Sequence, residues 1–370
     1  MSTFALIADP HITVPNPRTG WTPPPIPTEP TMYADSVELL EAAIDEINAL
    51  PHVDCVLVAG DLTKDSEPYN HERARELLTR FRRPVYCISG NHDQPRPPSL
   101  RPVEFLDPDV TPVRAAEIPR WYGDFGFKDT QRAAYSCDPT ADIHLVGICS
   151  SKPDEDRGYI VPEILAWLDE DLSRQRDPHR HTVVMLHHSI IDHVPDEAVN
   201  PMFSWFHVEN AAALKAVLRK HGVRLTLTGH LHMQDIKCED GLYNIVSASL
   251  ASFPHAYRIM TVRDGVLEIR SRALQATRSR PDLQRFSRKY TGRAFVGILT
   301  NVLMGQPFRY PRERAAAAAR QLNDWWPAIA KGDEQFHYTA EQLGDTALAA
   351  YVNSFNDPLG GDNERTIELE

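Results

Sequence analysis

The chain has 370 residues, of which 42% are apolar and 24% charged, a globular composition that excludes a disordered chain or a fibre. Its formal net charge of −12 makes nucleic acid a poor partner, because proteins that hold many phosphates are usually basic. The five cysteines are odd in number and show no Cys-x-x-Cys spacing, so we expect a reducing, cytoplasmic compartment and no disulfide framework.

Strand and helix patterns alternate in the first 90 residues. The chain enters its first apolar strand without a basic segment or a long apolar core, and no run of about 18 apolar residues occurs, so we expect no membrane span. The periodicity of Ser36–Leu50 predicts a helix with Leu40 and Ile44 on one face, and places Asp35 and Glu38 as a capping box. We expect strands at 4–8, 53–59 and 85–88, and a second helix at 71–81.

The alternation resumes after an irregular, proline-rich segment at 94–134 and gives way to helical periodicity beyond residue 276. An Asp264-Gly265 hairpin turn is expected within the last strand region. We therefore predict an α/β domain at residues 1–275 and a C-terminal helical module at residues 276–370. In the α/β part we expect strands at 143–149, 182–186, 223–227, 243–248 and 257–270, and helices at 162–174 and 209–221.

Polar side chains gather where the predicted strands end. In open α/β sheets, the carboxyl ends of the strands are where ligand sites form. A lone Asp-x-His or Gly-Asp is a common turn, but five such hits on five strand ends are hard to attribute to turns. They are "ADPH" with Asp9 and His11, "AGDLT" with Asp61, "GNHD" with Asn91 and His92, "LHH" with His187 and His188, and "GHLH" with His230 and His232.

Imidazole and carboxylate groups without thiolate favour Zn²⁺, Mn²⁺ or Fe ions and argue against a cysteine-type structural zinc site. There are too many ligands for one ion and about the right number for two. Two ions ~3.5–4 Å apart form the usual clamp for in-line displacement at phosphorus. Other templates are missing: there is no Gly-x-Ser-x-Gly elbow, Walker lysine loop, Gly-x-Gly-x-x-Gly or His-Glu-x-x-His.

In this order and spacing, "DPH", "GDLT", "GNHD", "LHH" and "GHLH" resemble the calcineurin-like metallophosphoesterase superfamily over roughly residues 1–270. Among its branches, "GDLTKDSEPY" and "TGHLHMQDI" resemble bacterial class III cyclic-nucleotide phosphodiesterases. "WYGDFGFKD", "HHSIIDH" and the trailing helices resemble the two-domain members of that group. We therefore expect an α/β protein built as a four-layer α/β/β/α sandwich with a small C-terminal α-helical module.

The resemblance also implies a role for each side chain. Asp61 would bridge two ions, together with a hydroxide that attacks phosphorus. His92 would bind no metal and would donate a proton to the leaving alkoxide. Many relatives have an acidic residue three positions after the bridging aspartate, where this chain has Lys64, so the group that orients His92 is left open. The ligands of one ion would be Asp9, His11 and His232, and those of the other Asn91, His187 and His230.

Other features leave two interpretations open. Trp21, in a proline-rich loop, would stack a base or simply pack the loop down. His188 would contact substrate or serve a structural role. The arginine-rich segment 270–293 suggests a solvated helix face or a subunit contact, with phosphate gathering as the alternative. The helical module would support a homo-oligomer or lean over the active site.

These features predict a dinuclear metal-dependent phosphodiesterase with Mn, Fe or Zn ions and a small phosphodiester substrate, cyclic nucleotides (cAMP or cGMP) being the leading class. The alternatives are hydrolases of glycerophosphodiesters, phospholipid headgroups or nucleotide-sugar pyrophosphates, because the same ligand set serves them all. A non-catalytic, metal-stabilised nucleotide-binding protein is the remaining alternative. It is disfavoured because a mere metal scaffold would not need His92.

Overall fold

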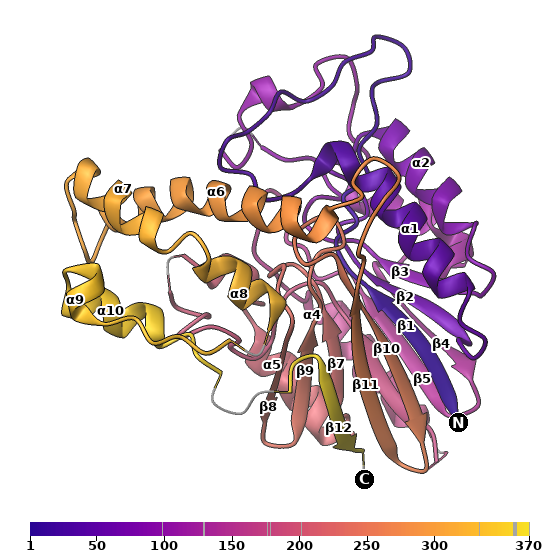
Figure 1. The fold of residues 1–370 in the computed structure, drawn as a ribbon. Helices are drawn as coiled ribbons and strands as arrows, with labels where there is room; N and C mark the ends of the chain where they lie inside the picture. The colour runs from indigo at the N-terminus through magenta and orange to yellow at the C-terminus, as the bar shows by residue number, and fades with distance from the viewer. Residues whose placement is uncertain are drawn as a thin grey trace.

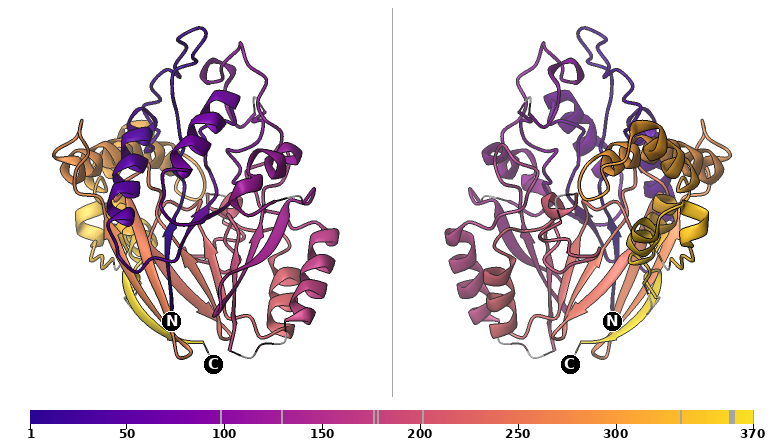
Figure 2. Two further views of the ribbon diagram at one scale, coloured as in Figure 1. Left: turned by 90° about the vertical axis from the view of Figure 1, so that its right-hand side faces the viewer. Right: turned by 90° about the vertical axis from the view of Figure 1, so that its left-hand side faces the viewer.

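The computed structural model describes residues 1–97, 99–128, 130–175, 177, 179–200, 202–332, 334–357 and 361–369. Two six-stranded sheets pack face to face, as Figures 1 and 2 show. The first contains β1 (Ser2–Ile7), β2 (Cys55–Ala59), β3 (Val85–Ile88), β10 (Ala256–Arg263), β11 (Val266–Ala273) and β12 (Glu364–Glu368), in the order β12-β11-β10-β1-β2-β3. The second contains β4 (Ala134–Thr140), β5 (Ile143–Ile148), β6 (His181–Met185), β7 (Leu225–Thr228), β8 (Asp235–Glu239) and β9 (Leu242–Val246), in the order β4-β5-β6-β7-β9-β8.

Helices cover the outer face of each sheet and complete the expected α/β/β/α sandwich (Figure 2). Side chains alternate along the strands: on β5, Leu145 joins the core between the sheets and Val146 joins the cluster under the outer helices. The helices α1 (Ser36–Asn48) and α2 (Pro68–Leu78) pack on the first sheet, and α4 (Pro162–Arg174) and α5 (Ala211–Lys220) on the second.

Parallel strand pairing brings the motif-bearing loops together. Strands β1, β2 and β3 are parallel neighbours, with Phe4 opposite Cys55 and Val56 opposite Val85. Strands β5, β6, β7 and β9 are likewise parallel in the second sheet. The carboxyl ends of these strands therefore lie at one end of the molecule, where loops from both sheets meet.

The C-terminal helices lie beside the sandwich (Figure 1) and form a second apolar cluster together with sandwich residues such as Met233 and Val246. The chain then returns: β12 pairs antiparallel with β11, with Ile367 opposite Leu267. The segment expected to be a helical module thus ends in a strand of the first sheet. Within the described residues, no helix is both long and apolar enough to cross a bilayer. The helices are α6 (Leu283–Met304), α7 (Arg312–Gln321), α8 (Trp325–Lys331), α9 (Ala340–Leu343) and α10 (Thr346–Asn353), and the remaining short helix α3 (Ile118–Trp121) lies in the proline-rich segment.

The capping box predicted at the start of α1 is wrong. Asp35 occupies the N-cap position but makes no side-chain cap hydrogen bond. Its carboxylate instead accepts a hydrogen bond from Arg280 Nε at 2.9 Å, and Glu38 accepts one from the Ser279 amide at 2.9 Å. Both carboxylates therefore accept hydrogen bonds from residues about 240 positions away along the chain. These long-range hydrogen bonds replace the capping box, and the sequence around Asp35 and Glu38 gives no sign of them.

Candidate metal centre

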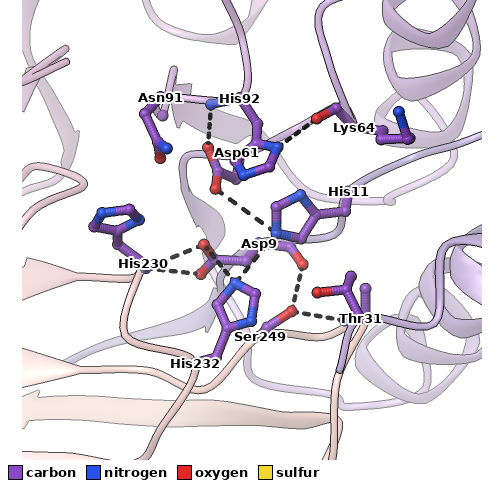
Figure 3. Close-up of polar contacts among 12 residues, drawn as sticks. Asp9, His11, Thr31, Asp61, Lys64, Asn91, His92, His230, His232 and Ser249 are labelled. Carbon is purple, nitrogen blue, oxygen red and sulfur yellow. Dashed lines mark hydrogen bonds and ion pairs between the residues drawn. The ribbon is translucent and has the colours of Figure 1, made fainter. Parts of the chain in front are cut away.

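The polar side chains expected at strand ends converge at the loop end of the two sheets (Figure 3). Asp9 follows β1, Asp61 follows β2 and Asn91 follows β3, whereas His187 follows β6 and His230 follows β7. All five side chains are buried. Both sheets thus contribute to one site, although its first and last members lie more than 200 residues apart.

The candidate ligands fall into two groups with one shared member. Within each group the ligand atoms lie within 4.8 Å of one another. Asn91 Oδ1 lies 3.1 Å from His187 Nε2, so the amide oxygen adjoins the second group. Asp61 is common to both, the first group being Asp9, His11, Asp61 and His232, and the second Asp61, His187 and His230. This His/Asp cluster could bind two metal ions.

Unsatisfied atoms in the cluster fit a cation. Asp61 Oδ2 is buried and accepts no hydrogen bond, although His187 Nε2 lies 3.3 Å away. His11 Nε2 and His232 Nε2 face each other at 3.2 Å, a contact in which two neutral rings can share only one proton. Burying such groups without a partner is costly. An ion between them would satisfy the lone pairs, and an imidazole and carboxylate set suits Mn, Fe or Zn.

Burial and mutual attraction set the charges of these groups. Burial lowers the pKa of His11 to about 3, which keeps the imidazole in the neutral form that binds metal. Burial alone would raise the pKa of Asp61, but His187 and His92 outweigh it and hold that pKa well below its usual range. Asp61 in turn raises the pKa of His187 to about 9 against the effect of burial. A bound ion would displace that proton, since metal binding and proton release are coupled.

Hydrogen bonds outside the two groups aim the ligand atoms inward. His187 Nδ1 lies 2.8 Å from the Ala59 carbonyl, which leaves Nε2 facing the cluster. Asn91 Nδ2 donates to Asp156 Oδ1 at 2.8 Å, which turns the amide oxygen toward His187. Such outer partners fix the tautomer and orientation of metal ligands.

The backbone around the cluster is folded into an uncommon conformation. A left-handed backbone at a residue other than glycine costs of order 1–3 kcal/mol and persists where the surroundings enforce it. A Cβ atom on Gly90 would overlap Asp61 Oδ1, and one on Gly229 would overlap Asp9 Oδ2, so both loops require glycine. Positive φ angles occur at Asp9 (50°), His11 (45°), Asp61 (49°), His230 (67°) and His232 (55°).

His92 lies beside the cluster but belongs to neither ligand group (Figure 3). Its amide donates to Asp61 Oδ1 at 2.9 Å, and its Nδ1 makes a short contact with the Lys64 carbonyl oxygen. Asp65 Oδ1 lies 3.7 Å from the same nitrogen. The partner that the sequence left open is therefore the main chain of Lys64, backed by the carboxylate of the next residue. Burial, and then Arg96, lower the pKa of His92 well below its usual value.

The structure does not bring Trp21 or His188 into contact with the open space above the cluster. The centre of the Trp21 ring lies 6.0 Å from Lys64 Nζ. His188 is fully buried, with Nδ1 2.8 Å from Ser150 Oγ and Nε2 2.8 Å from the Asp156 carbonyl. Neither residue lines the cavity described next.

A cavity of about 390 Å³ opens onto the cluster, and parts of its wall could not be predicted from the sequence. Arg96 and Arg101 line it, held by Asp156 at 2.8 Å and by Asp65 at 3.2 Å. Both arginines lie in the irregular segment at 94–134 and belonged to no predicted motif. Side chains of α6 and α8 also line it, so the helical region leans over the site.

A larger groove of about 1250 Å³ lies between α6 and β11, and none of the cluster residues lines it. It gathers much of the arginine-rich segment, including Arg285, Arg288 and Arg293. Part of this charge is already paired, since Arg285 lies 2.8 Å from Asp282 and Arg288 lies 3.1 Å from Asp324. The smaller cavity is therefore the one next to the candidate chemistry.

The chain is similar to known phosphoesterases in sequence and in fold. Residues 2–234 match the family of calcineurin-like phosphoesterases, more than half of the chain. The chain therefore belongs to the calcineurin-like phosphoesterase family. The crystal structure of a dimetal phosphatase from Danio rerio superposes with a TM-score of 0.53 at 15% identity, over 74% of this chain and 96% of that one. This similarity shows the shared fold.

Curated relatives are more modestly similar. A probable cyclic nucleotide phosphodiesterase of Synechococcus sp. is 26% identical over 189 residues, 50% of this chain and 60% of the relative. A 3′,5′-cyclic-nucleotide phosphodiesterase of Nostoc sp. is 26% identical over 188 residues, 50% and 58% of the two chains. A glycerophosphodiester phosphodiesterase of Enterobacter lignolyticus is 29% identical over 146 residues, 39% and 45%. The chain thus spans at most 60% of the length of these three relatives.

Proposed function

We propose that this protein is a dinuclear metal-dependent phosphodiesterase. The observation that carries the proposal is the position of Asp61, which belongs to both groups of candidate ligands. A carboxylate shared between two ions holds them a few ångströms apart, the arrangement that clamps both oxygens of an in-line displacement at phosphorus. His92, outside both groups but bonded to Asp61 through its amide, gives the site an acid–base group as well.

In this proposal each ion has three ligands besides Asp61. When bound, the two ions supply a Lewis acid for the phosphate and activate a water for attack. The donors suit Mn, Fe or Zn. Asp9, His11 and His232 hold one ion, and Asn91, His187 and His230 hold the other.

The proposed role of His92 is to donate a proton to the departing alkoxide. Its Nδ1 is engaged by the Lys64 carbonyl, so Nε2 is the nitrogen left for the substrate. A bound phosphodiester carries negative charge and would favour the protonated ring, offsetting the burial that lowers its pKa. Arg96 and Arg101 line the same cavity, where each is paired with a buried carboxylate, and in this proposal they contribute positive charge near the phosphate.

Cyclic nucleotides, cAMP or cGMP, are the substrate class that we propose first. This choice is supported by two similar proteins, from Synechococcus sp. and Nostoc sp., which are named as cyclic nucleotide phosphodiesterases. The similar glycerophosphodiester phosphodiesterase of Enterobacter lignolyticus keeps small diesters as the second candidate. Phospholipid headgroups and nucleotide-sugar pyrophosphates would use the same ligand set.

A hydrolysis screen with metal analysis of the same sample tests the proposal. The substrates are bis(p-nitrophenyl) phosphate, 3′,5′-cyclic nucleotides, glycerophosphodiesters and a nucleotide-sugar pyrophosphate, each with the wild-type protein and with Asp61→Asn. We expect turnover of diesters by protein that carries two ions, and loss of turnover in the variant. Wild-type protein that carries two ions and hydrolyses none of these compounds would contradict the proposal and would leave a nucleotide-binding role.

A further inference from the structure

The cavity above the metal cluster has two chemically different sides. One side carries the cluster with Arg96 and Arg101, and the other is formed by the C-terminal helices and the loop before α5. Helix α6 contributes Phe295, Ile298 and Leu299, and helix α8 contributes its two tryptophans. This second side is mainly apolar: it also has Met202, Phe203, Trp205, Phe206 and Leu231, and the loop at residues 28–33, which meets α6 at Gly297, adds the polar groups of Thr28 and Glu29 to the lining.

Stacked rings make the apolar wall rigid. Trp326 stacks on Phe295 at 4.5 Å between ring centres with 11° between the planes, and lies near-parallel to Phe203 at 6.1 Å. Phe206 continues the wall to the metal cluster, with its ring centre 4.6 Å from that of His230. The surface is therefore formed before any ligand arrives, which reduces the entropy lost on binding.

Trp205 is the exposed member of this wall. It is 41% exposed although it is a large apolar residue beside a cavity. Its indole nitrogen is already bonded to the Met202 carbonyl, and its ring packs 4.6 Å from Phe206. What remains open on the indole is apolar ring surface.

The chemistry of the wall selects among phosphodiesters. Hydroxyl groups of a small polar ester such as glycerol would lose water against the rings and aliphatic side chains of this surface, which offer them no acceptors. A planar aromatic ring would gain contact with the indole and the stacked phenyl rings. The phosphate of the same ligand would lie at the metal cluster, beside Arg96 and Arg101, on the other side of the cavity.

We propose that this wall is the subsite for an aromatic ring system esterified to the phosphate, such as a nucleobase-bearing group, and that Trp205 is its stacking surface. The inference rests on the proposed function, because the phosphate of the same ligand must sit at the metal cluster. Trp205 and Ile298 are then specificity-determining residues. Nucleoside-type diesters are favoured over glycerophosphodiesters.

Calorimetric binding of phosphonates to the metal-loaded protein tests the subsite without relying on turnover. Methyl-, cyclohexyl- and phenylphosphonate present the same anionic head, compared at a pH where all are dianions, with a different organic group. We expect phenylphosphonate to bind roughly 5–100-fold more tightly than methylphosphonate, the usual range for stacking on one aromatic side chain. Cyclohexylphosphonate should fall between them.

Variants of the apolar side of the cavity test whether it causes the preference for phenylphosphonate. Trp205→Ala and Ile298→Asn should both reduce the preference for phenyl over methyl and leave the dissociation constant of methylphosphonate within about threefold. Trp167→Ala is the matched control, because Trp167 lies on α4 over Arg132 and lines no part of the cavity. Equal affinity for methyl- and phenylphosphonate, cyclohexylphosphonate binding as tightly as phenylphosphonate, or an equal loss for all ligands in Trp205→Ala would overturn the subsite. Failure of the proposed function is distinct: the two-ion protein would hydrolyse no diester, whatever the phosphonate series shows.

Discussion

Asp93 and Thr63 join the two loops that carry the centre of the site. Asp93 Oδ1 accepts hydrogen bonds from the Thr63 amide at 2.9 Å and from Thr63 Oγ1 at 2.8 Å. Asp93 Oδ2 accepts two more, from the Leu62 and Gly90 amides, both at 2.9 Å. One buried carboxylate thus fixes the loop of Asp61 against its neighbour.

The first prediction concerns this joint. In Asp93→Asn the new amide NH₂ must face at least one backbone N–H donor, so at least one buried N–H loses its acceptor. We expect the free energy of unfolding to fall by about 2–4 kcal/mol, since each unsatisfied buried group costs about 1–3 kcal/mol. Urea unfolding measures this, with the exposed Asp109→Asn as control. An unchanged midpoint in Asp93→Asn would show that the carboxylate is dispensable.

The second prediction concerns metal stoichiometry. Asp61 is shared by both ligand groups and Asp9 belongs to one, so Asp61→Asn should weaken both ions and Asp9→Asn mainly one. Elemental analysis after exhaustive dialysis should then give a lower metal content for Asp61→Asn than for Asp9→Asn. Equal losses in the two variants, or two ions retained by Asp61→Asn, would contradict the shared position.

The third prediction tests proton donation by His92. A good leaving group departs without a proton, so His92→Ala should keep both metals and lose little activity on bis(p-nitrophenyl) phosphate. On a 3′,5′-cyclic nucleotide, whose alkoxide is a poor leaving group, kcat should fall roughly 10²–10⁴-fold. Steady-state rates on both substrates measure this, with the exposed His52→Ala as control. Similar losses on both substrates would instead mean that His92 positions the phosphate.

The fourth prediction concerns stability against pH at a site remote from the metals. Burial alone would lower the pKa of His144, but Asp171 at 3.0 Å and Asp138 at 2.8 Å outweigh it and raise that pKa. A raised folded-state pKa stabilises the fold fully below the unfolded value of 6.5, and this contribution is lost as pH rises through the folded value. The free energy of unfolding should therefore fall from about pH 6 upward.

The variant His144→Asn should remove that part of the pH dependence. Denaturant unfolding of wild type and variant on both sides of the transition gives the comparison, with His52→Asn as the matched exposed control. If the free energies of unfolding of wild type and His144→Asn differ by the same amount at every pH in this range, the charge of His144 does not contribute to stability through the two ion pairs.

The location of the candidate site could be predicted because each motif is a short sequence directly after a strand. Parallel strands end at the same edge of a sheet, so these motifs had to lie close together. The strands missed were β4, β8 and β12, which lie at sheet edges, where less of the strand is buried. β12 is an example: its pattern is exposed at Glu364 and Glu368, and only Ile367 is firmly buried against the sheet. Strand pairing with β11, almost a hundred residues earlier, determines that segment.

The apolar side of the cavity was beyond sequence reasoning for a different reason. Phe295 and Trp326 have the spacing of ordinary helix core residues, and most of their area does pack within the helical cluster. Their contact with the cavity depends on where α6 and α8 cross the sandwich. Likewise, His92 contacts the main-chain carbonyl of Lys64. Every residue has such a carbonyl, so only the folded loop shows which one lies beside His92.

The left-handed backbone at five candidate ligands has a consequence for sequence variation. Asparagine, aspartate, histidine and glycine accept that conformation, whereas valine, isoleucine and threonine strongly resist it. A library randomised at these positions and sorted only for soluble expression should therefore be depleted of branched residues there, independently of any ion. The residue types tolerated at each position would therefore identify the backbone positions of the candidate metal centre without any assay of phosphate hydrolysis. The positions are Asp9, His11, Asp61, His230 and His232.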